Sequence, residues 1–147
     1  MRKPFDPNLF GENDKRAREA ARRMFGHKYL VLDNPYKYDP DLLIYFPDFN
    51  FAGYMEVEVK QFWDGHDFTG KTIHIPERKS KFLGFDKIVF CVFNKQLTRC
   101  AWIHGDDLAK APKIKKPNKY MSSDEWFFEI PIEWMKFSKA IDSALES

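Results

Sequence analysis

The stretch that decides the fold is Tyr38–Gln61, YDPDLLIYFPDFNFAGYMEVEVKQ, in which two apolar runs are separated by a turn-rich segment. Successive side chains of a strand point to opposite faces of a sheet. If the MEVEVK part is a strand, its apolar side chains share one face, and Glu56, Glu58 and Lys60 share the other. With Asp41 on a neighbouring strand, two carboxylates and an ammonium meet at one point, and such oxygen ligands suit a hard divalent cation.

The order Pro40-Asp41, followed by Glu58, any residue and Lys60, resembles the signature of the PD-(D/E)XK nuclease superfamily. In that signature an Asp follows a Pro, and an acidic residue, any residue and a Lys lie on the next strand. The resemblance covers only the stretch quoted above and identifies no subfamily. It implies a restriction-endonuclease-like fold and hydrolysis of DNA phosphodiester bonds with Mg²⁺ (or Mn²⁺) as cofactor.

The resemblance also implies roles for individual side chains. Asp41 and Glu58 would hold the metal, and Lys60 would orient the attacking water or stabilise charge on the transition state. The alternatives are that Asp41 only caps a turn, that Glu58 is a solvated strand residue, and that Lys60 forms a surface ion pair with it. Glu56 is either a third ligand or a charge that faces solvent, and we favour the solvent-facing position.

Members of this superfamily usually add an acidic residue from the first helix. Residues 13–25 form an amphipathic pattern with a narrow alanine-rich stripe, which predicts that helix. Asp14 falls on the same side as this stripe, whereas Glu19 falls among the arginines of the opposite side. We therefore choose Asp14 as the additional metal ligand, and Glu12, just before the helix, remains an alternative. Asp14 could instead be a first-turn acid that favours the helix dipole.

Basic residues outside the first helix gather in two places, a predicted short helix over 76–82 and a long polar connection over 105–124. Lysine and arginine neutralise backbone phosphates without reading the sequence. The predicted nucleic-acid-binding residues are Arg78, Lys79, Lys81, Lys113, Lys115 and Lys116. The alternative is that these charges only solvate the surface. Trp63 could stack on a base and His74 could assist, although core packing and a structural role are the simpler readings.

The rest of the chain predicts a single domain over residues 1–147, with a mixed sheet flanked by helices, in the α/β or α+β class. Residues 87–93 are apolar on both faces, which predicts a central, doubly covered strand. The closing helix is expected over 131–145, with a buried stripe that includes Trp134 and Phe137. The other predicted strands are 29–32, 42–46, 53–62, 72–75, 98–104 and 126–130.

Composition sets broad limits on the class of protein. The chain is 44% hydrophobic and 17% aromatic with a net charge of +2, so it is not a polybasic tail. No apolar run is long enough to span a membrane, and we expect a cytoplasmic protein. Cys91 and Cys100 could form a cross-strand disulfide, but we expect two reduced, buried thiols. With only two cysteines, a zinc site made of cysteines is excluded.

The sequence thus predicts a metal-dependent deoxyribonuclease, directed by DNA structure or ends, of the phage, repair or recombination type. A chain of this length leaves no room for a separate sequence-reading domain, and a homodimer is compatible with it. One alternative is a catalytically inactive module of the same fold that binds nucleic acid or protein. A second alternative is an unrelated α+β domain in which the motif is fortuitous.

Overall fold

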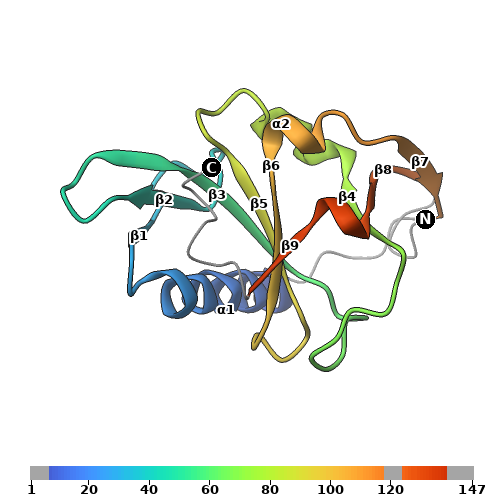
Figure 1. The fold of residues 1–147 in the computed structure, drawn as a ribbon, viewed down its shortest axis with the longest axis horizontal. Coiled ribbons are helices and arrows are strands. Elements are labelled where there is room, and N and C mark those ends of the chain that lie inside the picture. Colours follow the sequence, from blue (N-terminus) through green and yellow to red (C-terminus); the bar gives the residue numbers. More distant parts are fainter. Residues whose placement is uncertain (1–6, 118–123, 139–147) are drawn as a thin grey trace.

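A six-stranded mixed sheet runs through the centre of the molecule (Figure 1). The computed structural model describes residues 7–117 and 124–138, with side chains from Asp14 onward. Helix α1 (Pro7–Phe25) lies against one face of this sheet, where it packs on β1 and β3. In spatial order the strands are β1 (Leu30–Asp33), β2 (Leu42–Tyr45), β3 (Phe51–Val59), β5 (Val89–Phe93), β6 (Cys100–His104) and β9 (Lys136–Phe137).

A second, three-stranded antiparallel sheet covers the opposite face of β5. Its strand order is β4 (Thr72–Pro76), β8 (Glu125–Pro131) and β7 (Lys113–Lys116). Three short helices complete the described chain: the 3₁₀ helices η1 (Glu77–Phe82) and η2 (Ile132–Trp134), and α2 (Gly105–Leu108). Figure 1 shows this smaller sheet at the opposite end of the molecule from the β2–β3 hairpin.

The pairing of β3 makes the large sheet mixed. β3 is antiparallel to β2, with Leu42 opposite Met55, and parallel to β5, with Glu58 opposite Val92. A parallel pair needs a long crossover connection. Here the crossover runs over residues 60–88 and itself supplies β4 and η1, so the same segment that links two strands of one sheet starts the second sheet.

Strand β5 separates two hydrophobic clusters. Its odd-numbered side chains, Val89, Cys91 and Phe93, pack toward α1 with the buried alanines of that helix. Its even-numbered side chains, Phe90 and Val92, pack toward the smaller sheet. All five residues are buried, which confirms the prediction of a central, doubly covered strand.

Tight packing also fixes how the β2–β3 hairpin meets the start of β5. Gly53 has a φ of +149°, and a Cβ there would lie 2.6 Å from the carbonyl oxygen of Lys87. Only glycine accommodates both the backbone conformation and this close approach. The hairpin that carries the acidic row is therefore held directly against the central strand.

The structure corrects two predicted elements. The closing helix over 131–145 is wrong for residues 131–137, which form the end of β8, η2 and β9; the remainder of this range is not described beyond Ser138. The connection 105–124 is not purely irregular, since it contains α2 and β7. The α+β class with a mixed sheet is confirmed, and the second face is covered mainly by the smaller sheet and η1, with only the short α2 as an α-helix among the described residues.

Both cysteines are free and buried. Cys91 lies opposite Trp102 and Cys100 lies opposite Phe93, so the two thiols are staggered rather than directly opposed as the hairpin suggested. This confirms the expected pair of reduced, buried thiols.

Among the described residues, no helix is long and apolar enough to cross a membrane.

Candidate metal and nucleic-acid site

Asp41 lies immediately before β2, and its side chain, rather than its backbone, accepts the next hydrogen bond from β3. Its Oδ2 accepts a hydrogen bond from the backbone N–H of Val57 at 3.0 Å. Its own backbone N–H donates to Oε1 of Glu56 at 3.1 Å. The carboxyl groups of Asp41 and Glu56 are thereby fixed beside each other at the edge of the hairpin.

The surroundings of Asp41 disfavour its charge. Burial, followed by the negative charge of Glu56, raises the pKa of Asp41 from 3.8 to about 7, although the Val57 N–H acts in the opposite direction. The pKa of Asp14 is also raised, by burial and by the charge of Asp41, and is opposed by its ion pair with Arg18. The carboxyl groups of Asp14 and Asp41 are therefore close neighbours. Asp14 therefore lies where the phase of the helix predicted it.

Glu58 lies one pleat further along β3, in a different electrostatic setting. Its Oε2 is 3.0 Å from Nζ of Lys60, and its Oε1 is 3.6 Å from Nζ of Lys79. Burial alone would raise the pKa of Glu58, but the charges of Lys60 and Lys79 lower it from 4.5 to about 2. Glu58 is thus ionised at neutral pH and is held between two ammonium groups.

Lys79, on η1, connects the two parts of the cluster. Its Nζ is 3.3 Å from Oε2 of Glu56, in addition to its contact with Glu58. Burial disfavours its charge, yet the carboxylates of Glu58, Glu56 and Asp41 raise its pKa above 10.5. The expected direct meeting of Asp41 and Glu58 is thus replaced by a chain in which Glu56 and Lys79 lie between them.

Lys60 is 9% exposed and follows the last residue of β3. Its Nζ donates to the backbone carbonyl oxygen of His74 on β4, in addition to its ion pair with Glu58. Two fixed acceptors on two different sheets therefore hold this ammonium in place. The expectation that Lys60 lies in register with Glu58 is confirmed.

Glu56 is the main correction within the site. We favoured a charge facing solvent, but Glu56 is 9% exposed and contacts both Asp41 and Lys79. Its position follows from the alternation of β3, which places it on the face of Glu58. The burial of that face could not be seen in the sequence, because it depends on how η1 packs over the strand.

The cluster offers the oxygen ligands that Mg²⁺ prefers. Four carboxyl groups, from Asp14, Asp41, Glu56 and Glu58, are balanced by Lys60, Lys79 and Arg18. Burial and the neighbouring charge of Glu56 disfavour the ionised form of Asp41 more than Lys79 favours it. In the arrangement described, no group of three or more His, Cys, Asp and Glu residues surrounds a single point. The donor types fit a divalent cation, and binding one would require the side chains to converge.

The basic residues expected to bind nucleic acid are not equally available. Arg78 is largely exposed and pairs with Glu125, and Lys81 lies over the ring of Phe82 at 5.1 Å. Lys79, by contrast, lies inside the acidic cluster rather than on an open basic surface. The first two therefore remain accessible to phosphate, and Lys79 is available only if its two ion pairs open.

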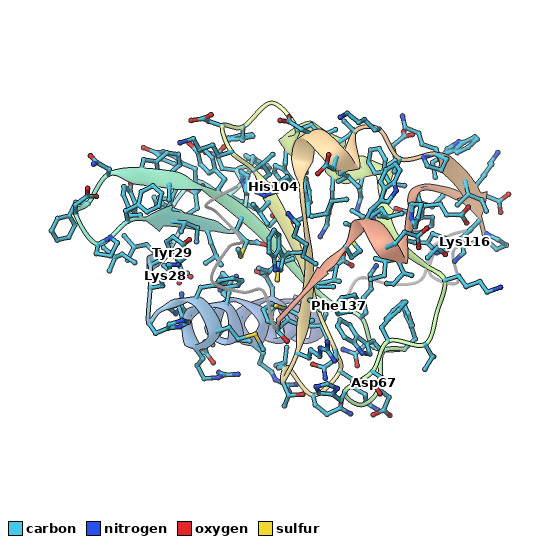
Figure 2. The ribbon with its side chains drawn as sticks, in the orientation of Figure 1. Lys28, Tyr29, Asp67, His104, Lys116 and Phe137 are labelled. Atoms are coloured by element: carbon cyan, nitrogen blue, oxygen red, sulfur yellow. The ribbon has the colours of Figure 1, made fainter. Side chains whose placement is uncertain are left out.

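Three lysines of the 105–124 connection, Lys113, Lys115 and Lys116, lie on β7, the edge strand of the smaller sheet. Lys113 pairs with Glu77 at 3.2 Å, and Lys115 is exposed. Figure 2 labels Lys116 on β7. Its Nζ is 3.0 Å from Nδ1 of His74, whose Nε2 is 3.1 Å from Glu129. Lys116 is the member of this set that lies nearest to Lys60, through their shared neighbour His74.

The first helix contributes fewer free charges than its sequence suggested. Arg18 and Arg22 both contact Asp33 at the end of β1, at 3.2 and 2.6 Å. The side chain of Glu12 lies outside the described residues. Of the acids considered on this helix, Asp14 is the one that contacts Asp41.

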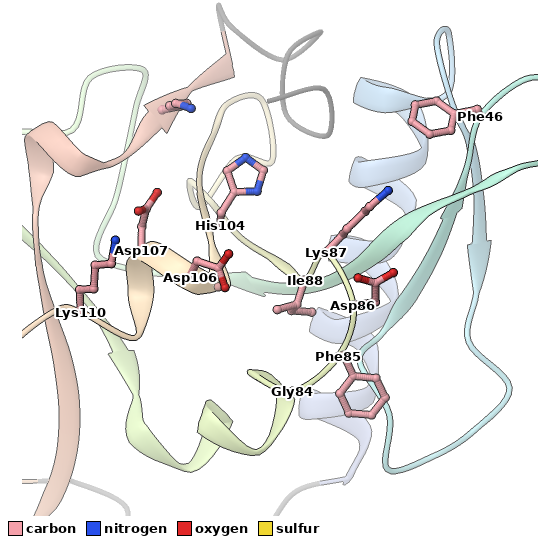
Figure 3. A pocket seen from close by; sticks show the side chains of 12 residues that line it. Phe46, Gly84, Phe85, Asp86, Lys87, Ile88, His104, Asp106, Asp107 and Lys110 are labelled. Atoms are coloured by element: carbon pink, nitrogen blue, oxygen red, sulfur yellow. The ribbon is translucent and has the colours of Figure 1, made fainter.

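A hollow of about 1000 Å³ lies elsewhere on the described surface, and none of the site residues named above lines it. Figure 3 shows Asp106, Asp107 and Lys110 on one side of it and Asp86, Lys87 and two phenylalanines on the other. A smaller pocket of about 390 Å³ includes His74 and Lys116, and so adjoins the site through β4 and β7.

Comparisons of the chain with protein-family models and with curated proteins find no match.

Proposed function

We propose that the protein is a Mg²⁺-dependent nuclease that hydrolyses DNA phosphodiester bonds on a restriction-endonuclease-like fold. The observation that carries the proposal is the row of ionisable side chains along β3, in which Glu58 is paired with Lys60 and Glu56 contacts Asp41, which itself lies beside Asp14. Burial and the charge of Glu56 raise the pKa of Asp41, and a bound cation would favour its ionised form.

Asp41 and Glu58, together with Asp14, would hold the metal, and Mn²⁺ could replace Mg²⁺. The bound ion would supply a water of lowered pKa and would polarise the scissile phosphate. Glu56 could add a further oxygen, since it already contacts Asp41.

Lys60 is positioned to stabilise negative charge on the phosphate or to orient the attacking water. Its Nζ is held by Glu58 and by the carbonyl oxygen of His74, which leaves one N–H of the ammonium for substrate. Because these acceptors come from two sheets, the ammonium needs little reorganisation when substrate arrives. The lowered pKa of Glu58 shows that this acceptor stays ionised across the physiological range.

Phosphate groups on either side of the cut would be bound by Arg78 and Lys81 near η1 and by Lys113, Lys115 and Lys116 on β7. Arg78 and Lys115 are exposed, and the ion pair of Arg78 with Glu125 is of the weak surface kind that phosphate can displace. Binding through such contacts does not depend on base sequence.

The direct test is a cleavage assay on supercoiled, linear and branched DNA with Mg²⁺, Mn²⁺ or EDTA. Asp41→Asn and Glu58→Gln should each lower metal-dependent cutting by at least about 100-fold. Exposed Asp106 provides a matched control, and Asp106→Asn should cut like the wild type. Equal cutting by Asp41→Asn and wild type would overturn the proposal.

The second candidate is an inactive nucleic-acid-binding module, and the position of Lys79 favours it. An ammonium between Glu56 and Glu58 neutralises carboxylates that a metal would otherwise need. In that case the protein would bind DNA in EDTA and cut none of the substrates with either metal. Thermal unfolding with and without Mg²⁺ separates the two candidates, since a metal that binds the folded state raises the melting temperature.

A further inference from the structure

We propose that the pocket beside Lys60 binds a single unpaired nucleobase, so that the substrate is nucleic acid with unpaired nucleotides next to the scissile phosphate. This inference rests on the proposed function, which it narrows from DNA in general to strands with accessible bases.

The pocket is placed by the same contacts that hold Lys60. The backbone N–H of Trp63 donates to the carbonyl oxygen of Lys60 at 3.0 Å, and the carbonyl oxygen of His74 accepts from its ammonium. Trp63 and His74 both line the pocket, whose volume is about 390 Å³. A phosphate at Lys60 would therefore have this pocket as its immediate neighbour.

Its walls are aromatic on one side. Phe62 is 67% exposed, and its ring lies 6.0 Å from that of Phe68, which in turn lies 5.4 Å from that of Trp63. A large apolar ring held at the surface, and packed on other rings, offers a face on which a base can stack.

The polar groups of the pocket complement a nucleotide. Lys116 supplies a cation for a flanking phosphate, next to His74. Asp64 and Asp67 supply carboxylates that can accept hydrogen bonds from exocyclic amino groups of bases. Asp67 and Lys116 are labelled in Figure 2, and they come from the loop after β3 and from β7.

The wall carrying the aspartates is anchored rather than loose. Asn94 is fully buried and donates to the carbonyl oxygen of Gly65 at 3.0 Å, and the N–H of Gly65 donates to Gln96 at 2.9 Å. Asp67 is also 3.6 Å from Arg99. A preformed wall lowers the entropy lost on binding, so the pocket can contribute affinity for one base.

A base within a duplex is stacked and paired, and entering the pocket would require its extrusion at a cost of a few kcal/mol. Single strands, overhangs and frayed ends avoid this cost. The chemistry of the pocket therefore favours single-stranded regions over continuous duplex.

The test measures binding in EDTA by fluorescence anisotropy, with a labelled single strand, a blunt duplex and a single strand carrying abasic sites. The variant is Phe62→Ala, which truncates an exposed ring. The matched control is Phe49→Ala, whose ring is 75% exposed in the β2–β3 turn away from the pocket. Circular dichroism verifies that both variants fold.

We expect the wild type to bind the single strand more tightly than the blunt duplex. Phe62→Ala should weaken single-strand binding by roughly 5- to 100-fold, and Phe49→Ala should change it less than twofold. The abasic strand should bind wild type and Phe62→Ala alike, because it keeps the phosphates and lacks the base. Equal loss with Phe49→Ala, or an unchanged affinity in Phe62→Ala, would overturn the proposal.

The readout separates this inference from the proposed function. If the wild type cuts DNA with metal but shows no base-dependent binding, the inferred base pocket is rejected and the proposed nuclease function stands. If binding depends on the base but no substrate is cut with either metal, the base pocket is supported and the proposed nuclease function is rejected.

Discussion

The two ends of the acidic cluster use the same side-chain chemistry and have opposite electrostatics. At one end, Asp41 lies against Asp14 and Glu56, and its pKa is raised to about 7. At the other end, Glu58 lies between Lys60 and Lys79, and its pKa is lowered to about 2. Both carboxyl groups experience burial that favours the neutral acid, so the difference between them comes from their charged neighbours.

This contrast shows where a cation would have the greatest effect. Two ammonium groups contact Glu58, whereas the Asp41 end holds three carboxyl groups with Arg18 paired to Asp14 and with Lys79 shared between Glu56 and Glu58. A divalent ion would relieve repulsion at Asp41 and would compete with lysine at Glu58. The free protein therefore keeps Glu58 ionised and holds Asp41 close to its titration point.

The largest expected effect is that two amide substitutions change the free energy of unfolding in opposite directions. At pH 8 in EDTA, Asp41→Asn should raise the free energy of unfolding, because it removes a carboxylate whose ionisation is disfavoured. The difference between pKa 3.8 and about 7 sets a ceiling of about 4 kcal/mol, and we expect about 1–3 kcal/mol. Glu58→Gln should lower it by about 1–3 kcal/mol, since the pKa of Glu58 falls from 4.5 to about 2 on folding.

Urea denaturation followed by circular dichroism measures both values. Asp106→Asn serves as the control and should lie within about 0.5 kcal/mol of the wild type. Destabilisation of similar size by both amides would show that the two ends of the cluster do not differ.

An intermediate effect is expected from the lysine that joins the two ends. Lys79→Met leaves Glu56 and Glu58 with one cation fewer and should lower the free energy of unfolding by about 2–3 kcal/mol. Lys81→Met, two residues along the same 3₁₀ helix, alters an exposed lysine over the Phe82 ring and should change it by less than about 0.5 kcal/mol. Equal effects in the two variants would mean that Lys79 does not link the ends.

Over any single pH unit, the smallest expected effect is a slope in the pH dependence of stability. A carboxyl whose pKa is raised on folding loses stability as pH rises, so Asp41 should lower the free energy of unfolding between pH 4 and 7, by up to about 1.4 kcal/mol per pH unit. Glu58 acts in the opposite direction, and its contribution is lost as pH falls from 4.5 toward 2. Subtracting the Asp41→Asn curve from that of the wild type isolates the first slope.

A flat difference curve between pH 4 and 7 would contradict the raised pKa of Asp41. The same difference measured with excess Mg²⁺ should become shallower, because a bound cation favours the ionised carboxylate.

Sequence periodicity was sufficient to predict the local part of this site. The alternation of MEVEVK places Glu56, Glu58 and Lys60 on one face of β3, and helix phase places Asp14 toward the sheet. These positions follow from the geometry of one strand and one helix. The burial of Glu56 and the insertion of Lys79 depend on the crossover after β3, and no local pattern reports how that segment packs.

The C-terminal part shows why a helical spacing of apolar residues was not sufficient. Trp134 is 39% exposed and Phe137 pairs with Ala101 on β6, so sheet pairing overrides the expected helix. Strand β7 was missed because its sequence has no pattern of apolar residues. Three of the four residues in its sequence, Lys-Ile-Lys-Lys, are lysines. Charged side chains of this kind protect an exposed edge strand from pairing with other chains.

The crossover between β3 and β5 also bears on when the site can form during synthesis. The acidic row is complete once Lys60 has been made, but β4, which holds the Lys60 ammonium, pairs along its whole length with β8 at Glu125–Pro131. A nascent chain that emerges from the ribosome N-terminus first has its acids long before the strand that covers them. The Lys60 ammonium would therefore reach its acceptor on β4 in a paired sheet only after β8 has been made.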